Sequence, residues 1–475
     1  MFLLKGISVS AAKKAFLFFL LIYFSIMACW AKPKEETLKF GRFGTVHIYK
    51  GSEHPKHVVL FVSGDGRWNL GVVDMARALA KRDTLVAGID IIHYLQRLDK
   101  ASGKCSYPAA DFEGLSQYLQ KYYKFKDYVR PVLAGYSSGA TLVYAIISQS
   151  PPNTFLGSIS LSFCPDLPVA KPFCRGQGLH SRKRKDKGYD FLPDKNLRTP
   201  WITLQGTIDQ VCDPKIAARL VSQSSNATFV SLPHVGHGFG VQRNWMPQFQ
   251  KAFTTLTDRK EIFTPTTSEL KALPLIEEPS NSNNDVFAVV ISGDGGWASI
   301  DRQIAKALKE DGVSVVGLDS LHYFWKRRTP KEGAKDLARI ISYYLHNWHK
   351  KKVILVGYSR GADVLPFMVS RLPEQIQDKV QLLALLGVEH KVDFEFHMAD
   401  WIPGSSSENA PYDVKREVLK LEDLNVLCVY GEDEHDSICH ELNAKKFHIL
   451  KLSGGHHFGG NYKSISAKIL EVAKK

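Results

Sequence analysis

Apolar runs alternate with amphipathic helical patterns along most of this chain. The apolar run at 58–62 leads into a glycine-rich loop at 63–68, and a helical pattern follows over Val72 to Lys81. A second apolar run, Leu85 to Asp90, precedes another helical pattern over Ala109 to Lys121. Strands that alternate with helices predict a parallel sheet covered on both faces, with functional loops at the carboxyl ends of the strands.

The same order of elements returns in the second half of the chain. The loop at 292–297, Ser-Gly-Asp-Gly-Gly-Trp, repeats the Ser-Gly-Asp-Gly-Arg-Trp of 63–68. In each copy an Asp follows the Trp by 22 positions and a His by 25, giving Asp90 with His93 and Asp319 with His322. Helical patterns then flank another apolar run; they cover Ile300 to Glu310 and Lys331 to Trp348, with the run at Val313 to Asp319 between them. Solenoid repeats span roughly 20–50 residues, so this much longer unit indicates a duplicated domain.

A polar segment separates the two copies. Thr264 to Asn284 is rich in Pro, Ser, Thr and Asn, which is typical of a linker. We therefore expect domains at 32–262 and 285–475 joined by a linker at 263–284, each domain of a size that one core supports. The predicted fold class is α/β, with two tandem domains built on mainly parallel, doubly wound sheets.

Both copies contain a serine between two glycines at the end of a strand pattern. The run at 352–356 leads into Gly-Tyr-Ser-Arg-Gly around Ser359, and the run at 132–134 leads into Gly-Tyr-Ser-Ser-Gly around Ser137. Gly-x-Ser-x-Gly between a strand and a helix is the nucleophile elbow of α/β hydrolases, in which the glycines make room for a strained turn. The pattern predicts Ser359 and Ser137 as nucleophiles; the alternative is a tight turn with an incidental serine.

A serine needs a histidine that accepts its proton and a carboxylate that orients the histidine. In this fold the three groups follow in the order Ser, acid, His. An Asp-x-Ile-Cys motif lies downstream of Ser359 and an Asp-x-Val-Cys motif downstream of Ser137. Matching the two motifs equates Asp436 with Asp209, so we expect Asp436 rather than Glu434 to be the acid of the second copy.

Each copy ends with a histidine in a glycine-rich loop. His237 in Gly-His-Gly-Phe-Gly matches His456 in Gly-His-His-Phe-Gly, which makes His456 the expected base and His457 a packing or substrate contact. The predicted triad is Ser359, Asp436 and His456, with a possible second triad of Ser137, Asp209 and His237.

The oxyanion of the reaction needs backbone N–H donors. This fold takes one from the residue after the nucleophile, hence Arg360, and one from the first glycine loop, hence Gly295 or its neighbour Asp294. A triad of this kind needs no cofactor. The cysteines contain no CxxC pair typical of zinc sites, so we expect no metal either.

The first thirty or so residues differ from the rest. Three lysines precede the apolar run at 15–27, and small residues follow, which is typical of a secretory signal peptide over 1–31. The run is short for a membrane span, which needs about 20 residues. We expect cleavage and a periplasmic protein; a lipid anchor at Cys29 or an uncleaved anchor is the alternative.

Six cysteines lie beyond Cys29, an even number that favours disulfides in an oxidising compartment. Cys428 and Cys439 are the only two in the second half, so they can pair only with each other if that half folds by itself.

Composition narrows the class of partner. With 44% hydrophobic and 23% charged residues, the chain has the make-up of a soluble globular protein. Its formal net charge of +14 suits an anionic membrane surface. The basic run at 182–187 is a solvated loop or a contact for phosphate or lipid headgroups. It is not accompanied by any nucleic-acid-binding module, so we expect no nucleic-acid partner.

These motifs resemble the bacterial virulence protein VirJ family. The similarity lies in the segments 291–297, 357–366 and 455–458, and the two-domain layout with an export signal resembles the longer, AcvB-type members. The resemblance implies a periplasmic α/β-hydrolase that removes the amino acid from aminoacyl-phosphatidylglycerol, typically lysyl-phosphatidylglycerol. Its implied partner is therefore an anionic membrane phospholipid, and Ser359, Asp436 and His456 would be its triad.

The two copies differ just after the serine. Arg360 and Asp363 of the second copy correspond to Ser138 and Thr141 of the first, which is why we expect the main active site in the second domain. We interpret Asp363 or Asp319 as a contact for the substrate ammonium, although Asp363 would also suit a helix N-terminus. The apolar segment 394–403 is an expected lid, which would dip into the membrane or pack on its own domain.

A second class of function stays open. The VirJ resemblance also suggests a non-catalytic, chaperone-like accessory that assists envelope or secretion-system proteins. A pure binding module has no need to keep Ser, acid and His in order, and the preserved order favours the enzyme.

Overall fold

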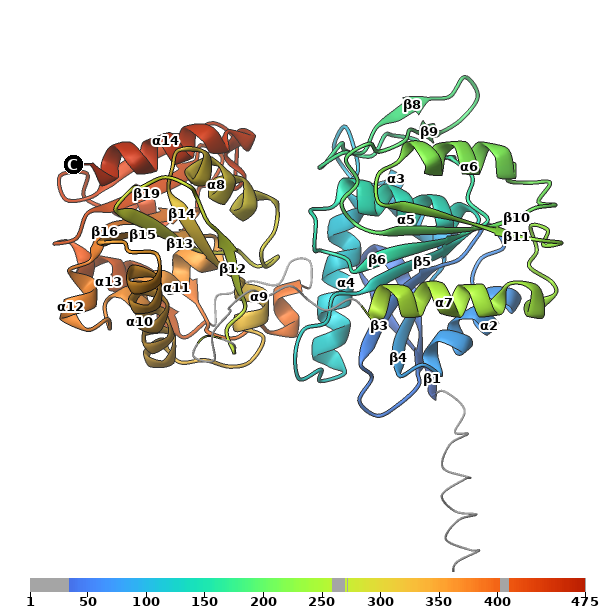
Figure 1. Ribbon diagram of the computed structural model, residues 1–475, viewed down its shortest axis with the longest axis horizontal. Helices are drawn as coiled ribbons and strands as arrows, with labels where there is room; N and C mark the ends of the chain where they lie inside the picture. Colours follow the sequence, from blue (N-terminus) through green and yellow to red (C-terminus); the bar gives the residue numbers. More distant parts are fainter. Residues whose placement is uncertain (1–33, 259–269, 271, 402–409, 475) are drawn as a thin grey trace, which may run out of the picture.

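The computed structural model describes residues 34–258, 270, 272–401 and 410–474. Two α/β domains lie side by side (Figure 1), and each contains one large sheet with helices on both faces. The expected signal peptide and Cys29 lie outside the described residues, as do residues 263–269 and 271 of the expected linker. Across the described part, none of the helices combines the length and apolar character that crossing a bilayer requires.

The first domain contains an eight-stranded sheet in the order β1-β2-β4-β3-β5-β6-β10-β11. The β1–β2 and β2–β4 pairs are antiparallel and the remaining pairs are parallel. The strands are β1 (Lys34–Phe40), β2 (Gly44–Lys50), β3 (His57–Val62), β4 (Thr84–Ile89), β5 (Val132–Tyr136), β6 (Gly157–Leu161), β10 (Trp201–Gly206) and β11 (Ala227–Leu232). The helices are α2 (Leu70–Ala80), α3 (Ile91–Asp99), α4 (Pro108–Tyr122), α5 (Ser138–Gln149), α6 (Pro214–Gln223) and α7 (Met246–Thr257). A small separate sheet holds β7 (Asp166–Leu167), β8 (Ser181–Lys183) and β9 (Tyr189–Phe191).

The second domain repeats this arrangement in a seven-stranded sheet of order β12-β14-β13-β15-β16-β19-β20, antiparallel only at β12–β14. Its strands are β12 (Leu275–Glu278), β13 (Val286–Ile291), β14 (Ser314–Leu318), β15 (Lys352–Tyr358), β16 (Val380–Leu386), β19 (Val426–Gly431) and β20 (His448–Leu452). Its helices are α8 (Ser299–Glu310), α9 (Ser320–Tyr323), α10 (Pro330–Asn347), α11 (Arg360–Val369), α12 (Glu374–Gln377), α13 (Val414–Val418) and α14 (Tyr462–Ala473). A short ribbon pairs β17 (Lys391–Val392) with β18 (Tyr412–Asp413). The prediction of two tandem, mainly parallel α/β-hydrolase-like domains is confirmed.

Alternating side chains of the central strands divide each core into two layers. Val58, Leu60 and Val62 of β3 pack on one side with α3, α4 and α5, whereas Val59 and Phe61 pack on the other with α2 and α7. A strand buried on both faces reads as a continuous apolar run, which is why the runs in the sequence predicted these strands.

The second sheet begins earlier than the sequence suggested. Residues 275–278, expected within the linker, form the edge strand β12, and Leu275 is fully buried in the core. This strand has only four residues, two of them polar, and its sequence does not recur in the first copy. Its local pattern therefore did not predict a strand.

Three disulfides stabilise the loops around the sheets. Cys428 and Cys439 pair as predicted. The first domain contains Cys105–Cys174 and Cys164–Cys212.

The end of α4 and the loop after it join the first domain to the second. Tyr128 is 5% exposed and belongs to the hydrophobic core of the second domain, where it contacts Trp325 with ring centroids 5.2 Å apart. Lys121 Nζ donates to the Trp325 carbonyl at 2.6 Å, and Trp325 Nε1 donates to the Phe125 carbonyl at 3.0 Å. The two domains therefore share packed and hydrogen-bonded surface as well as a connecting chain.

Candidate active sites

The two serines lie in sharp turns between a strand and a helix. Ser137 follows β5 with φ of 54°, and Ser359 follows β15 with φ of 52°. The left-handed region costs a residue with a Cβ about 1–2 kcal/mol. A Cβ at Gly135 or Gly357 would collide with the carbonyl at the start of the following helix. Both segments are therefore nucleophile elbows, and their glycines are required by close backbone approach.

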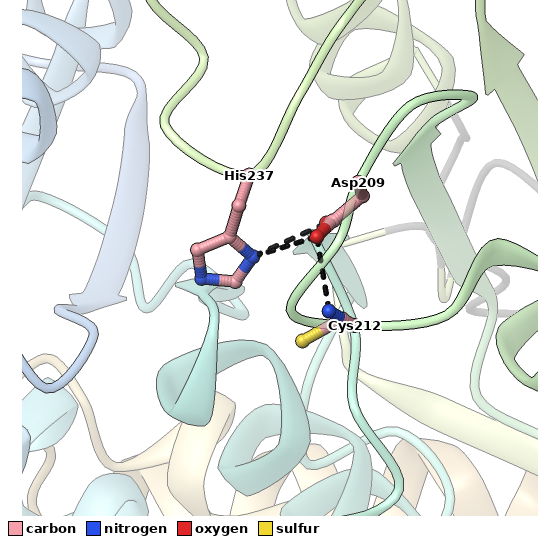
Figure 2. Close-up of side chains that lie close together, drawn as sticks. All are labelled: Asp209, Cys212 and His237. Carbon is pink, nitrogen blue, oxygen red and sulfur yellow. Dashed lines mark hydrogen bonds and ion pairs between the residues drawn. The ribbon is translucent and has the colours of Figure 1, made fainter.

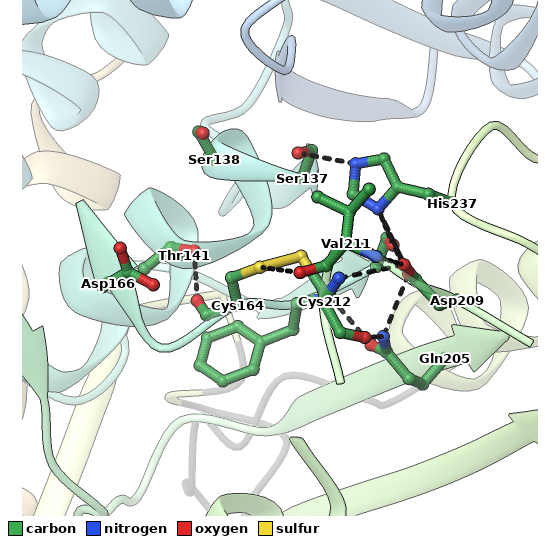
Figure 3. Close-up of a disulfide and its surroundings, with 12 residues drawn as sticks. Ser137, Ser138, Thr141, Cys164, Asp166, Gln205, Asp209, Val211, Cys212 and His237 are labelled. Atoms are coloured by element: carbon green, nitrogen blue, oxygen red, sulfur yellow. Dashed lines mark hydrogen bonds and ion pairs between the residues drawn. A yellow bond between two sulfur atoms is a disulfide. The ribbon is translucent and has the colours of Figure 1, made fainter. Parts of the chain in front are cut away.

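In the first domain the serine, histidine and carboxylate are already in contact. Ser137 Oγ lies 3.1 Å from His237 Nε2, and His237 Nδ1 lies 3.1 Å from Asp209 Oδ1. Figure 3 shows the three side chains in line, from α5 through the loop after β11 to the loop after β10. The imidazole can take the serine proton at one nitrogen while the carboxylate holds the other.

Several donors hold Asp209 as an anion. The N–H groups of Val211 and Cys212 each donate to Asp209 Oδ1 at 2.9 Å, and Gln205 Nε2 donates to Oδ2 at 3.2 Å. The Ser162 hydroxyl bonds to the same carboxylate. Burial alone would raise the pKa of Asp209, but these hydrogen bonds and His237 outweigh it and keep the pKa below its usual range.

Asp209, Cys212 and His237 lie close enough together to suggest a metal site (Figure 2). Cys212 is bonded to Cys164, however, so its sulfur is not the thiolate that binds metals. His237 Nδ1 already faces Asp209. The donor set fits a proton relay and does not fit a metal centre.

In the second domain Glu434, and not Asp436, contacts the histidine. Glu434 Oε1 lies 2.5 Å from His456 Nδ1, and Glu434 Oε2 accepts the Gly431 N–H at 2.6 Å. Asp436 is exposed. The prediction of Asp436 was therefore wrong, and the choice of His456 over His457 agrees with the observed contact.

The cysteines that were used to align the two copies have different partners in the structure. Cys212 pairs with Cys164 in the loop after β6, whereas Cys439 pairs with Cys428 inside β19, so the two motifs are not equivalent. The useful landmark is the glycine that ends each strand, since the acid follows Gly206 and Gly431 by three positions in both copies.

One neighbouring position accommodates the change from Asp to Glu. Ser162 follows β6 and its hydroxyl lies 2.9 Å from His237 Nδ1. The corresponding residue after β16 is Gly387, where a Cβ would lie 2.9 Å from His456 Nδ1 and 3.4 Å from Glu434 Oε1. The first copy thus combines a short acid with a serine, and the second a longer acid with a glycine.

The serine of the second domain is less tightly held. Among the described contacts there is no hydrogen bond between Ser359 and His456. Burial would lower the pKa of His456, but Glu434, Glu389 and Asp294 raise it above its usual value. Three carboxylates thus act on the imidazole of this site through their charge.

In each copy the first glycine of the glycine-rich loop, Gly64 or Gly293, lies against the serine, and in the second copy this is not the predicted Gly295. A Cβ on Gly293 would lie 3.4 Å from Ser359 Cβ, and one on Gly64 3.0 Å from Ser137 Cβ. Gly295 instead faces Glu113 of the first domain, 3.5 Å from such a Cβ. Asp294, the alternative donor, directly follows the glycine beside Ser359. The Arg360 N–H lies in the first turn of α11, where N–H groups lack an intrahelical partner.

A family comparison covers most of these residues. The model of the family described as "Bacterial virulence protein (VirJ)" matches residues 56–156 and 285–475, which is more than half of the chain. The chain belongs to the VirJ family. The second matched region includes Ser359, Glu434 and His456. The first includes Ser137 but ends before Asp209 and His237. Comparison with curated proteins finds no match.

Solved structures similar to this chain include esterases and a dienelactone hydrolase. The esterase domain of a Rhodothermus marinus protein is 16% identical, with 47% of this chain and 98% of that chain covered and a TM-score of 0.32. Est1E from Butyrivibrio proteoclasticus is 11% identical, with 47% and 99% covered and a TM-score of 0.33. Dienelactone hydrolase from Anabaena variabilis is 17% identical, with 49% and 100% covered and a TM-score of 0.35.

The structure gives Arg360 a role that the sequence did not reveal. Its Nε donates to Asp294 in the oxyanion loop at 2.8 Å, and its guanidinium stacks on Phe396 with 4.1 Å to the ring centroid. Another nitrogen donates to Asp400 at 3.0 Å. In the first domain the shorter Ser138 donates to Asp65 at 2.7 Å. Arg360 thus ties the oxyanion loop to the expected lid, and Phe396 of that lid is buried against its own domain.

The residues expected to contact a substrate ammonium have other partners. Asp363 is 5% exposed, and its Oδ1 accepts the Glu389 N–H at 2.7 Å. Asp319 caps α9 by accepting the His322 N–H at 3.0 Å and also accepts the Trp297 N–H at 3.2 Å. His457 is exposed, with its Nδ1 3.4 Å from the Tyr358 hydroxyl.

Glu389 and Asp294 are accessible carboxylates beside the second site, and Asp294 is paired with Arg360. Both act on His456 through their charge. Burial and the charge of Asp294 raise the pKa of Glu389. The loop after β16 that carries Glu389 lacked any motif in the sequence, which is why sequence reasoning did not select it.

Proposed function

We propose that this chain is a serine esterase that hydrolyses the aminoacyl ester of aminoacyl-phosphatidylglycerol, with lysyl-phosphatidylglycerol as the main substrate. The observation that carries the proposal is the contact of Ser137, His237 and Asp209, repeated in the second domain as the His456–Glu434 pair beside Ser359. Membership of the VirJ family also supports a hydrolase.

The chemistry follows from the arrangement of these groups. The serine Oγ attacks the carbonyl carbon of the aminoacyl ester while the histidine takes its proton. Backbone N–H groups of the oxyanion loop and of the residue after the serine stabilise the oxyanion. The bond to the glycerol oxygen breaks, and the histidine returns the proton to that oxygen. Water then hydrolyses the acyl-enzyme by the same route, releasing the amino acid and the free serine.

The carboxylates around the second site support a cationic acyl group. Glu389 and Asp294 are accessible, and their charges already raise the pKa of His456. An ammonium within several ångströms of a carboxylate is favoured even when solvent partly screens the pair. We therefore assign hydrolysis of the lysyl ester to the second domain, with Ser359 as nucleophile, Glu434 as acid and His456 as base.

We further propose that the reaction takes place at the outer face of a bacterial inner membrane, in the periplasm. Three disulfides are consistent with an oxidising compartment. The net charge of +14 favours an anionic lipid surface.

The test compares serine variants on vesicles that contain lysyl-phosphatidylglycerol, with released lysine as the readout. Ser359→Ala is expected to remove most of the activity, and Ser359→Ala with Ser137→Ala to reduce it at least about 10³-fold. Ser342→Ala on the exposed face of α10 is the matched control and should leave the rate unchanged. Undiminished lysine release by the double variant would contradict the proposal.

A further inference from the structure

A pocket of about 900 Å³ opens on the first domain beside the oxyanion loop. Gly44, Asp90 and His93 form part of its wall, at the junction of β2, β4 and α3. We call it the basic pocket because five of the side chains that line it are cationic: Lys39, Arg42, Arg67, Arg97 and Lys100.

Protein carboxylates balance only part of this charge. Arg42 pairs with Asp111 at 2.6 Å, and Arg67 lies 3.6 Å from Asp90. Within the described part of the chain, Lys39, Arg97 and Lys100 have no ion-pair partner. Like charges gathered around one concave site repel each other and create a field that attracts an anion.

The backbone at Arg67 indicates that this side chain has a function there. Arg67 has φ of 65°, in the left-handed region that disfavours side chains. The equivalent residue of the second domain is Gly296, with φ of 71°. The loop can thus be built with glycine, and the first domain nevertheless carries an arginine in a backbone conformation that disfavours side chains.

The equivalent place on the second domain is covered by the first domain, with a pocket of about 660 Å³ between them. There Tyr128 of the first domain packs on His322, with ring centroids 5.3 Å apart, and Glu113 faces Gly295. His93 is the counterpart of His322, and in the first domain it borders the open basic pocket. Tyr128 is buried against the second domain of its own chain, so the Tyr128 of a second copy is not free to enter the basic pocket. The cationic lining favours an anion instead.

We propose that the basic pocket binds a phosphate group, carried by a lipid headgroup or by a soluble phosphate ester. Arginine guanidinium groups make paired hydrogen bonds to phosphate oxygens, and lysine ammonium groups add charge at longer range. The inference does not rest on the proposed reaction, because it concerns a site outside both sets of serine, histidine and acid.

A bound phosphate would also act on the loop that lies against the nucleophile. The Arg67 N–H donates to the Gly64 carbonyl at 3.0 Å, and Gly64 is the glycine that lies against Ser137. The pocket and the first active site therefore share one loop, which the phosphate would hold through Arg67.

The test measures binding, with no activity readout. Calorimetry with glycerol phosphate examines a soluble ester, and flotation with vesicles of phosphatidylcholine, with or without phosphatidylglycerol, examines the lipid headgroup. Arg97→Glu with Lys100→Glu should weaken binding at least tenfold, since each basic residue near an anionic surface contributes substantially. Lys39→Glu changes a residue of β1 and should also weaken binding.

The matched control is Lys215→Glu with Arg219→Glu, an equal charge change on exposed residues of α6, which lies near the opposite edge of the sheet from β1 and β2. Loss of binding to both probes in the pocket variants identifies the phosphate group as the ligand, and loss on vesicles alone identifies the lipid headgroup. The proposal is overturned if the unaltered protein binds neither probe, or if the control loses as much affinity as the pocket variants.

Discussion

At the scale of single residues, the two copies reach the same contact with different side chains. Asp209 with Ser162 in one copy corresponds to Glu434 with Gly387 in the other. Each pair fills the space around one imidazole nitrogen, so the length of the acid and the size of its neighbour must change together. The position of the acid is fixed by its distance along the chain from the end of the strand.

Glu434→Gln tests the assignment of Glu434 as the acid. The variant is made in a Ser137→Ala background, in which only the second site can contribute activity. Glu434 raises the pKa of His456, so its neutralisation should lower that pKa. Because the histidine must be unprotonated to act as base, the acid limb of the pH–rate profile should shift to lower pH. The maximal rate should fall about 10²–10⁴-fold, since the imidazole loses its orienting carboxylate.

Asp436→Asn is the matched control, and both the maximal rate and the acid limb of the pH–rate profile should be unchanged. A larger loss from Asp436→Asn than from Glu434→Gln would return the acid role to Asp436.

At the scale of elements, the sites are built from loops at the carboxyl ends of parallel strands. Asp363 in α11 accepts the Glu389 N–H, and so a buried carboxylate positions the loop after β16. Arg360 in the same helix positions the oxyanion loop through Asp294. The first turn of α11 therefore organises the entrance to the second site.

Glu389→Gln tests the proposal that this part of the entrance faces the substrate. Removing its charge should lower the ratio of kcat/KM for lysyl- over alanyl-phosphatidylglycerol about three- to tenfold, mainly through KM, as expected for a partly screened ion pair. Glu374→Gln in the remote helix α12 removes an equal charge and should leave the ratio unchanged. If both variants shift the ratio equally, Glu389 does not recognise the ammonium.

The elements were more predictable from the sequence than the site. The long apolar runs and the glycines of the elbows fixed the central strands and both serines, because these signals are local. Strand β12 is short and takes its place only by pairing with β14. The choice of Glu434 and the partners of Asp319 and Asp363 depend on contacts between distant segments, which spacing along the chain does not encode.

At the scale of the whole molecule, one chain carries two elbows in domains that are joined through Tyr128 and Trp325. Glu113 of the first domain reaches the glycine loop of the second, where burial and the charge of Asp319 raise its pKa to about 7. The first site has a complete relay and a cationic pocket nearby, whereas carboxylates surround the second. The two sites thus differ in the charge of the groups around them.

The central claim is that Ser137 and Ser359 are both activated nucleophiles, and covalent labelling tests it most directly. The purified protein is treated with a fluorophosphonate, which forms a stable ester with an activated serine, and peptide mass mapping locates the adducts. Adducts are expected on Ser137 and Ser359, with the first lost in His237→Ala and the second lost in His456→Ala. A folded protein in which neither serine is modified would contradict the account.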